Sequence, residues 1–493
     1  MDSSLWSSIE FNKYMQNSYS DTICALATPT GGAIAVVRVS GPQALAITAK
    51  IFHPASHGPF LDAKANSLHY GTILPLSDAH PDSEKSNLDE KNQDVIDDVV
   101  VSVWRAPHSY TGEDAVEISC HGSAYIVRNI LQELIRSGCR QARRGEFTLR
   151  AFLNGKMDLS QAEAVADLIA ADNKASHDMA MSQLKGHFSS ELARLREQLL
   201  KLTSLLELEL DFSDHEDLEF ADRKKLYDLA QKINNKIATL AKSFETGQAL
   251  KKGIPVAIVG KTNVGKSTLL NQLLNEDKAI VSDIDGTTRD TIDGTIDING
   301  VTFRFIDTAG IRQTDDKVEK IGIKRAYEQI NKATVILWVI DSRPSEDEIK
   351  DLSLHLGYDV RLHSAENASD KALIVVHNKA DLSPTPLFEG EVAISAKKGS
   401  HISLLKEVIF EKAKIPDISE DTVIVSNTRH YEALLRAHAD ITRVIEGMSA
   451  GLSSDLVAED LRQCLDNLAE ITGGKITTEE TLGNIFQHFC VGK

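Results

Sequence analysis

The stretch from Ile254 to Leu274 reads IPVAIVGKTNVGKSTLLNQLL, and it decides how the middle of the chain folds. Its first six residues are a short apolar run typical of a buried strand, and its last residues are typical of a helix. Between them, Gly260 to Ser267 match the pattern G-x-x-x-x-G-K-[S/T]. The glycines of such a loop let backbone N–H groups close around phosphates at the start of a helix. The stretch therefore predicts a phosphate-binding loop in which Lys266 approaches the β- and γ-phosphates.

Three further motifs follow in order, each after a strand-like run. DTAG (Asp307–Gly310) follows VTFRFI, NKAD (Asn378–Asp381) follows ALIVVH, and SAK (Ser395–Lys397) follows EVAI. Asp307 can lie near Mg²⁺, and the amide of Gly310 can sense a γ-phosphate. The carboxylate of Asp381 can accept from guanine N1–H and the exocyclic amine, which adenine cannot offer. Four such elements in this order predict a guanine-nucleotide domain that binds GTP.

The loop Ser282–Asp290 is the natural first switch, with Thr288 and Ser267 as the expected Mg²⁺ ligands. Ile311 occupies the place where Ras-type GTPases carry a water-positioning Gln, and an aliphatic side chain cannot orient water. Asn263 and the oxygens of the switch loop could instead hold K⁺, although an ordinary loop hydrogen bond explains Asn263 equally well. Glu319 could orient the attacking water, or it could be a solvated helix residue. The predicted GTP-binding residues are Asn263, Val264, Gly265, Lys266, Ser267, Thr268, Ser282, Asp283, Ile284, Asp285, Gly286, Thr287, Thr288, Asp307, Thr308, Ala309, Gly310, Asn378, Lys379, Asp381, Ser395, Ala396 and Lys397.

The pattern of apolar residues divides the rest of the chain. From Gly253 to about Lys414, strands alternate with helices, which predicts a mainly parallel sheet with helices on both faces. The segments before and after it are helical, so the simplest arrangement is one helical domain split in sequence by an inserted α/β domain. An N-terminal α/β region precedes them. The expected bounds are 1–20 for an extension, 21–157 for the N-terminal domain, 158–250 and 417–493 for the helical domain, and 251–416 for the nucleotide domain.

Several local features carry narrower expectations. Capping boxes are predicted at Ser160–Glu163 and Thr477–Glu480, each before a helix. Ser77–Asp98 is polar and acidic and predicts a surface loop, and Glu207–Phe220 predicts a solvated acidic turn rather than a metal site.

Composition limits the class of protein. The 493 residues include 54 Lys plus Arg and 72 Asp plus Glu, so the net charge of −18 excludes a globally basic nucleic-acid binder but not a local basic face. Five scattered cysteines without CxxC spacing argue against a disulfide framework or a cysteine zinc site. No apolar run is long enough for a membrane span, and the N-terminal residues lack a secretory pattern. A cytoplasmic protein is therefore expected.

Motifs along most of the chain resemble the MnmE (TrmE) family of tRNA-modification GTPases, from about Thr22 to Lys493. They are TPTGGAIAVVRVSG, SYTGEDAVEISCHG, RRGEFTLRAFLNGKMDLSQAEAVADLI, DGTTRD, DTAGIR with VEKIGIKRA, and the C-terminal LGNIFQHFCVGK. The resemblance implies an N-terminal α/β domain that dimerises and binds tetrahydrofolate, a discontinuous helical domain and an inserted Ras-like P-loop G domain.

The same resemblance implies an activity and partners. A homodimer would join an FAD-containing, NADH-using MnmG (GidA) family subunit in a heterotetramer. The complex would form 5-aminomethyl- or 5-carboxymethylaminomethyl-uridine at the tRNA wobble position, with the carbon supplied by 5,10-methylene-tetrahydrofolate. 5-Formyl-tetrahydrofolate is the other folate form expected to bind. Hydrolysis would be stimulated by K⁺ through G-domain dimerisation.

Site residues implied by the resemblance fall on matching positions of this chain. Folate contacts fall on Arg38, Glu117, Lys156 and Lys493, whose charges suit the anionic tail and the pterin edge. The implied K⁺ contacts are Asn263, Ser282, Ile284 and Thr287, the Mg²⁺ contacts Ser267 and Thr288, and the water-orienting carboxylate Glu319. Cys490 is either a catalytic thiol or a partly buried structural one.

Binding of tRNA by so acidic a chain needs local cations. Arg140, Arg143, Arg144 and Arg150 are candidates, with a solvated basic surface as the alternative. The alternative functions are a ribosome-assembly GTPase and a regulatory GTPase switch. The first usually carries an RNA-binding module with a GXXG loop, which is not found after NKAD, and the second leaves the four folate residues unexplained.

Overall fold

The computed structural model describes residues 19–56, 58–76, 95–211, 223–277, 294–306, 330–362, 371–383, 385–416, 422–474, 479–487 and 489–492. The chain divides into two compact units. The first comprises Met1–Ala166, Gln183–Arg223 and Glu446–Lys493, and the second comprises Asp167–Ser182 and Lys224–Ile445. Each unit is described by itself.

The first unit contains a sheet with the strand order β3-β4-β5-β6-β2-β1-β7 among the described residues. The pairs are antiparallel except for β1 with β7. Its strands are β1 (Ile23–Leu26), β2 (Ile34–Ser40), β3 (Phe52–Pro54), β4 (Ser67–Ile73), β5 (Asp97–Trp104), β6 (Ala115–His121) and β7 (Arg140–Gln141). The β-branched runs at 33–39 and 99–104, which are typical of strands, lie almost entirely within β2 and β5. The predicted acidic loop extends too far, because Asp97 and Asp98 already belong to β5; residues 77–94 lie outside the described part.

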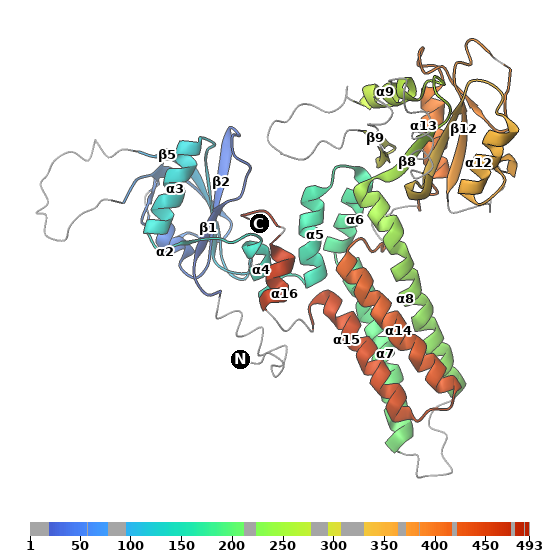
Figure 1. Ribbon diagram of the computed structural model, residues 1–493. Helices are drawn as coiled ribbons and strands as arrows, with labels where there is room; N and C mark the ends of the chain where they lie inside the picture. The colour runs from blue at the N-terminus through green and yellow to red at the C-terminus, as the bar shows by residue number, and fades with distance from the viewer. Residues whose placement is uncertain are drawn as a thin grey trace, which may run out of the picture. The chain divides into compact units, whose positions relative to one another are not determined.

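One face of this sheet is buried, and the other is open at strands β4 and β5. Apolar side chains of α2 (Ala44–Thr48) and α3 (Ala124–Arg136) form a core with inward residues of the strands (Figure 1). On the opposite face, Leu68 is 71% exposed and Tyr70 is 59% exposed. Val100 pairs with Tyr70 in register and is also exposed. Strands β4 and β5 therefore alternate between a covered apolar face and an uncovered face that is still partly apolar. Strand β1 is buried on both faces, since Ile23 and Ala25 pack with Phe147 of α4 (Glu146–Leu153).

The remaining elements of the first unit are mostly helical. They include η2 (Phe60–Asp62), α4 (Glu146–Leu153), most of α5 (Leu159–Ala170), α7 (His187–Asp211), α15 (Ser454–Thr472) and α16 (Glu479–Phe486). Helices α7 and α15 pack side by side, and Arg462 forms an ion pair with Glu207 at 2.8 Å (Figure 1). Residues 207–211 of the predicted turn thus belong to helix α7. Residues 212–222 lie outside the described part.

The first predicted capping box is wrong by two residues. The side chain of Asp158 accepts from the backbone N–H of Gln161 at 2.9 Å, and the side chain of Gln161 accepts from the N–H of Asp158 at 2.9 Å. Ser160 lies inside α5 and donates to Asp158 instead. A carboxylate and an amide therefore perform the reciprocal capping that the sequence pattern assigned to Ser160 and Glu163. The second predicted box, Thr477–Glu480, cannot be followed in the same way, because residues 477 and 478 lie outside the described part.

The second unit contains a sheet with the strand order β13-β12-β11-β8-β10-β9 in its described residues. All pairs are parallel except β10 with β9, so the prediction of a mainly parallel sheet is confirmed. The strands are β8 (Ile254–Val259), β9 (Thr295–Ile298), β10 (Val301–Phe305), β11 (Val335–Ile340), β12 (Ala372–His377) and β13 (Val392–Ala393).

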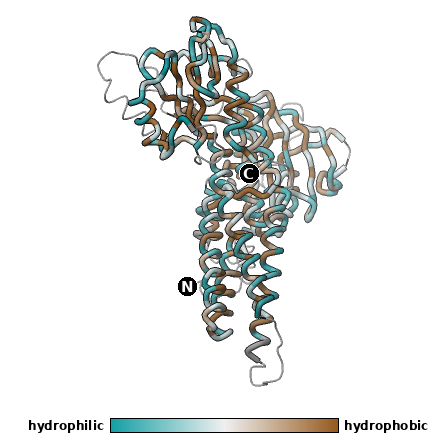
Figure 2. The backbone as a smooth tube through the Cα atoms, turned by 90° about the vertical axis from the view of Figure 1, so that its right-hand side faces the viewer, coloured by the Kyte–Doolittle hydropathy of each residue, from teal (hydrophilic) through white to brown (hydrophobic). Residues whose placement is uncertain are grey.

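Helices cover both faces of this parallel sheet. One apolar core joins the strands to α9 (Lys266–Asp277) and α13 (Ile402–Lys412), and another joins them to α12 (Glu346–Leu356). The long helices α8 (Arg223–Lys252) and α14 (Thr428–Ser449) also belong mostly to this unit, where Phe244 stacks on Tyr431 at 4.3 Å between ring centroids. Hydrophobic and hydrophilic residues alternate along the long helices (Figure 2), as amphipathic packing requires.

The fold is therefore multidomain, with α/β and helical parts, and a mainly parallel sheet lies between two helical stretches of sequence. Short elements complete it, namely α6 (Lys174–Leu184) and η3 (Val360–Leu362). A search of the described helices for one both long and apolar enough to cross a membrane finds none.

Candidate functional site

The phosphate-binding loop connects the end of β8 to the start of α9. Gly260 has φ +144°, and a Cβ there would lie 2.3 Å from the carbonyl oxygen of Val339. Gly265 has φ +96°, and a Cβ there would lie 2.2 Å from Nδ2 of Asn378. Glycine is thus required at both positions by close contacts as well as by backbone conformation. Asn263, between them, has φ +63°, a conformation that Asn tolerates better than most residues.

The lysine of the loop is held by main-chain oxygens. Nζ of Lys266 donates to the carbonyl oxygen of Gly260 at 2.8 Å and also to that of Lys261. Burial lowers the pKa of Lys266, because a buried site disfavours its charged form. An anion beside Nζ would favour the charged form, so this geometry suits a phosphate-bearing ligand.

The base-recognition motifs meet the phosphate-binding loop. Nδ2 of Asn378 donates to the carbonyl oxygen of Val264 at 2.8 Å, and Oδ1 of Asn378 accepts from the backbone N–H of Ala396 at 2.9 Å. Lys379 donates to the carbonyl oxygen of Asn263 at 2.8 Å. Asn378 is 3% exposed, so it acts as a buried bridge between three segments far apart in sequence.

The carboxylate expected to select guanine is Asp381. It is exposed, and Nζ of Lys398 lies 3.1 Å from its Oδ2. A hydrogen bond from Ser395 and then the nearby Lys398 lower the pKa of Asp381. It is therefore a charged acceptor at neutral pH.

Two partners of this site were not singled out from the sequence. Asp341 forms an ion pair with Lys379 at 2.6 Å, and Glu391 hydrogen-bonds Nδ1 of the buried His377 at 2.8 Å. Asp341 directly follows β11, so the rule that found the other residues at strand ends could have found it. Glu391 offers no such signal, because its role depends on the turn before β13.

Much of the predicted catalytic machinery lies outside the described residues. This applies to the switch positions Ser282, Asp283, Ile284, Asp285, Gly286, Thr287 and Thr288, to Asp307, Thr308, Ala309 and Gly310, and to Glu319 and Lys493. Ser267 and Thr268 lie in the first turn of α9, and Ser395, Ala396 and Lys397 follow β13.

A second site lies on the face of the first unit's sheet that is opposite α2 and α3. Arg38 on β2 and Glu117 on β6 are opposite each other in register and form an ion pair at 2.8 Å. The guanidinium of Arg38 lies 5.5 Å from the ring centroid of Tyr110 and 5.6 Å from that of Phe147. A cavity of about 270 Å³ surrounds this pair; it is lined by Arg38, Trp104, His108, Ser109, Tyr110, Thr111, Ala115 and Glu117.

The C-terminal segment reaches this cavity. Nη1 of Arg38 donates to the carbonyl oxygen of Gly492 at 3.2 Å. The backbones of Arg144 and Val491 form an isolated antiparallel β-bridge. Cys490 is exposed, whereas Cys24, Cys120, Cys139 and Cys464 are buried. The expectation that Cys490 is a partly buried structural thiol is therefore wrong. Lys156 is not among the residues that line the cavity; its Nζ donates to the carbonyl oxygen of Pro107 at 2.9 Å.

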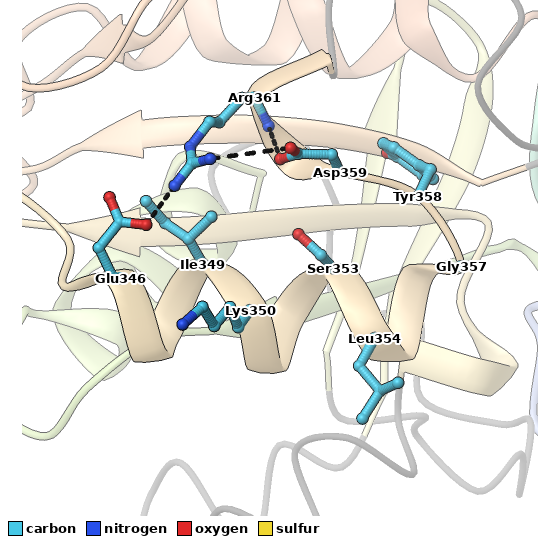
Figure 3. Close-up of a pocket in the computed structure, with 9 residues that line it drawn as sticks. All are labelled: Glu346, Ile349, Lys350, Ser353, Leu354, Gly357, Tyr358, Asp359 and Arg361. Carbon is cyan, nitrogen blue, oxygen red and sulfur yellow. Dashed lines mark hydrogen bonds and ion pairs between the residues drawn. The ribbon is translucent and has the colours of Figure 1, made fainter.

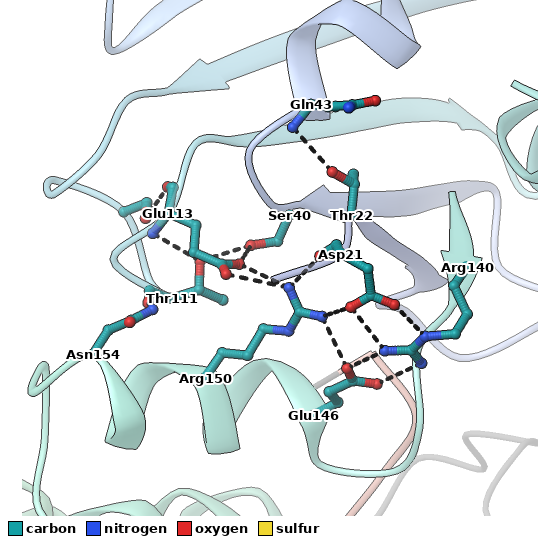
Figure 4. A network of polar contacts seen from close by, with 11 residues as sticks. Asp21, Thr22, Ser40, Gln43, Thr111, Glu113, Arg140, Glu146, Arg150 and Asn154 are labelled. Atoms are coloured by element: carbon teal, nitrogen blue, oxygen red, sulfur yellow. Dashed lines mark hydrogen bonds and ion pairs between the residues drawn. The ribbon is translucent and has the colours of Figure 1, made fainter. Parts of the chain in front are cut away.

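Two of the arginines considered for RNA contact belong to a polar network instead (Figure 4). Arg150 is 1% exposed and contacts Asp21, Glu113 and Glu146 at 2.7–3.2 Å. Arg140 pairs with Asp21 and with Glu146. A basic surface made of all four arginines is therefore wrong, because their acidic partners neutralise these two.

The second unit also carries a shallow groove beside α12 (Figure 3). Its volume is about 520 Å³, and Leu354 on its edge is 78% exposed. An ion pair links Arg361 to Glu346 at one end. None of the predicted nucleotide-site residues lines it, so it is separate from the phosphate-binding loop.

The parallel sheet, the glycine-dependent loop and the bridging Asn378 define a P-loop protein whose base motifs are those of guanine-nucleotide binders. Comparison with known proteins refines this class. A family model described as the MnmE helical domain matches residues 159–490, and one described as the GTP-binding protein TrmE N-terminus matches residues 22–156.

Curated relatives agree over nearly the whole chain. A tRNA modification GTPase MnmE of Phocaeicola vulgatus is 51% identical over 96% of this chain and 99% of its own length. Those of Bacteroides thetaiotaomicron and Parabacteroides distasonis are 49% and 51% identical over 96% of this chain and 99% and 100% of theirs. This chain therefore belongs to the MnmE (TrmE) family of tRNA modification GTPases.

Proposed function

We propose that this chain is the GTP-hydrolysing component of a complex that modifies the wobble uridine of tRNA. The observation that carries the proposal is the meeting of the phosphate-binding loop with both base motifs through the buried Asn378. Family membership supports the tRNA part, because the relatives matched over nearly their full length are named for that activity. The domain bounds predicted from the sequence remain part of this proposal.

At the nucleotide site, the chain's residues would bind and orient GTP. Lys266 would contact the β- and γ-phosphates, and Asp381 with the Ser395–Lys397 backbone would recognise guanine. Ser267 and Thr288 would hold Mg²⁺. Asn263, Ser282, Ile284 and Thr287 would contribute oxygen ligands to K⁺, which would supply positive charge beside the phosphates. Glu319 would orient the attacking water.

The cavity at Arg38 would bind a reduced folate as the carbon donor. The carboxylate of Glu117 suits the amino and ring N–H edge of a pterin, and Arg38 suits an acidic tail or a carbonyl. Trp104 and Tyr110 also line the cavity, and their aromatic rings would supply apolar surface to a pterin. Lys493 would complete the site, since the adjoining Gly492 already contacts Arg38. Cys490, being exposed, would be accessible for chemistry near the same site.

The partners follow from the family and from one exposed surface. The open sheet face with Leu68, Tyr70 and Val100 would form a homodimer interface, because contiguous exposed apolar residues favour association. An FAD-containing MnmG (GidA) family subunit using NADH would complete a heterotetramer in the cytoplasm and would supply much of the tRNA contact.

A hydrolysis assay and a binding assay test the proposal. The full-length chain should hydrolyse GTP faster in KCl than in NaCl, and calorimetry should detect 5-formyl-tetrahydrofolate binding in the absence of nucleotide. GTP hydrolysis with no folate binding under any condition would favour the alternative, a ribosome-assembly or regulatory switch. Failure to bind GTP would contradict both functions.

A further inference from the structure

His377, the last residue of β12, is a buried histidine directly before the base motif NKAD. It is 1% exposed, and its Nδ1 lies 2.8 Å from Oε1 of Glu391. Because an ionised carboxylate only accepts hydrogen bonds, Nδ1 carries the hydrogen of this contact. Nε2 has no hydrogen-bond partner within the described part of the chain. An apolar side chain would fill the same space without that cost, so the bond to Glu391 is what the imidazole adds.

The other carboxylate oxygen of Glu391 holds the turn before β13. Oε2 accepts from the backbone N–H of Leu387 at 3.1 Å and from that of Phe388 at 2.9 Å. The side chain of Glu391 is 7% exposed, so water competes little for these bonds. The ring of Phe388 packs edge-on against Trp338 of β11, with 5.6 Å between the ring centroids. One carboxylate thus joins the turn to the end of β12, and the Phe388 ring joins the same turn to the core.

The strand that follows this turn has little pairing of its own. Within the described residues β13 has two residues, lies at the edge of the sheet and pairs with β12. The backbone N–H of Ile394 donates to the carbonyl oxygen of His377 at 2.8 Å, and the Ser395–Lys397 motif begins at the next residue. So short a strand fixes its neighbours weakly, and the position of the motif therefore depends on the contacts of the turn as well.

Contacts from the end of β12 reach the guanine motif from two sides. Inside the motif, the side chain of Asn378 accepts from the N–H of Ala396 at 2.9 Å. Before the motif, the adjacent His377 holds the turn through Glu391. Lys266, which faces the phosphates, is held by a separate loop.

We propose that His377 and Glu391 are positioning residues that set the affinity for guanine nucleotides by holding the Ser395–Lys397 backbone against the O6 edge of the base. The proposal rests on the proposed recognition of guanine by this motif. It predicts that loss of the His377–Glu391 contact weakens binding of the base and spares the contacts to the phosphates.

His377→Leu is the first test, because it removes the donor to Glu391 and keeps an apolar side chain of similar size. Calorimetric titration of the full chain with GDP should show Kd raised about three- to tenfold, since a buried carboxylate loses a hydrogen-bond partner. His377→Asn keeps a donor nitrogen at the place of Nδ1 and should restore most of the affinity. His430→Leu is the matched control and should leave the affinity unchanged, because His430 is also 1% exposed but lies on α14, outside the nucleotide motifs.

A base analogue separates positioning of the motif from general damage to the domain. The diphosphate of 2-aminopurine riboside keeps the 2-amino group and both phosphates but lacks O6. Measured by displacement of fluorescent GDP, its Kd should change by less than about twofold in His377→Leu. Equal losses for both ligands would overturn the positioning role, because they would mean that the whole nucleotide site is disturbed.

Glu391→Gln is the milder second variant, which keeps the test decisive if His377→Leu does not fold. Its amide offers one acceptor oxygen to the three donors around it, so GDP affinity should fall here too. Unchanged GDP affinity in both His377→Leu and Glu391→Gln, or in Glu391→Gln alone where His377→Leu does not fold, would overturn the proposal. A wild-type chain that binds no GDP would contradict the proposed function as well.

Discussion

The nucleotide loop and the Arg38 cavity are built in opposite ways. The nucleotide loop depends mainly on backbone groups, namely the glycines at 260 and 265 and the carbonyl oxygens that hold Lys266. Only the side-chain amide of Asn378 is added to them. The second depends on side chains from distant strands, with Arg38 and Glu117 paired across a sheet and Gly492 contacting Arg38 from the chain's other end. A backbone site leaves a contiguous motif in the sequence, whereas a site of paired side chains leaves scattered charges.

The largest expected effect is a loss of GTP affinity, caused by a substitution that disrupts the nucleotide loop alone. Gly265→Val introduces a Cβ at 2.2 Å from Nδ2 of Asn378 at a residue with φ +96°. We expect GTP affinity to fall by about 100-fold or more, since overpacking and backbone strain together cost about 3 kcal/mol. Fluorescent-GTP titration measures this. Gly357→Ala, with φ +79° and nothing within 4 Å of its Cβ, is the control for backbone strain alone. Folate affinity should not change in either variant.

The second effect is a loss of folate affinity, caused by a substitution that disrupts the Arg38 cavity alone. Arg38→Ala removes the partner of Glu117 and the contact with Gly492. Loss of a partly buried charge partner costs about 2–5 kcal/mol, so folate affinity should fall by about 30-fold or more while GTP binding stays unchanged. Calorimetry with both ligands on one protein sample checks the separation. Equal loss of both ligands would show that the two sites are not independent.

A smaller effect concerns base choice. Asp381→Asn replaces a charged acceptor by an amide, which can donate to the C2 carbonyl oxygen that xanthine carries in place of the exocyclic amine of guanine. We expect GTP affinity to fall about tenfold, because the variant loses about one charge-assisted hydrogen bond to guanine. The affinity for xanthosine triphosphate should rise. Competition titrations with both nucleotides measure the ratio. An unchanged ratio would contradict the role assigned to Asp381.

The smallest effect is on acid stability of the polar network around Arg150. Burial opposes ionisation of Glu146, but the hydrogen bond from Arg140 and other nearby donors outweigh it and lower the pKa of Glu146 below 4.5. A lowered folded-state pKa means that this stabilisation is present above about pH 4.5 and is lost as the pH falls through the folded value.

Urea unfolding of the full chain at several pH values between 3 and 6 tests this. The wild type should lose stability across the window faster than Glu146→Gln, which carries no titrating group there. Identical slopes for wild type and Glu146→Gln would show that this carboxylate does not contribute.

The sequence predicted the parallel sheet nearly to the residue, because β8, β11 and β12 are buried apolar runs bounded by turn residues. It also placed Asn378 and Gly265 in one site, because the ends of parallel strands meet at one edge. It failed where contacts depend on three-dimensional pairing. Arg150 reads as a surface cation beside Arg143 and Arg144, yet three acidic residues from separate segments surround it.

The Arg38 cavity could be predicted only by family resemblance. No spacing rule links positions 38, 117 and 492. The pairing of β2 with β6 brings Arg38 beside Glu117, and a hydrogen bond from Arg38 joins Gly492 to them. The capping of α5 by Asp158 shows the same limit at short range, since two overlapping sequence patterns competed and the geometry of the helix start selected one.

Nucleoside mass spectrometry of tRNA tests the central claim, that a GTP site and a folate site of this chain serve one modification. In cells that lack the protein, C5-substituted wobble uridines should disappear and should return with the wild-type chain. Neither Gly265→Val nor Arg38→Ala should restore them, although each variant retains the other ligand. Full restoration by Arg38→Ala, at equal protein abundance, would contradict the account.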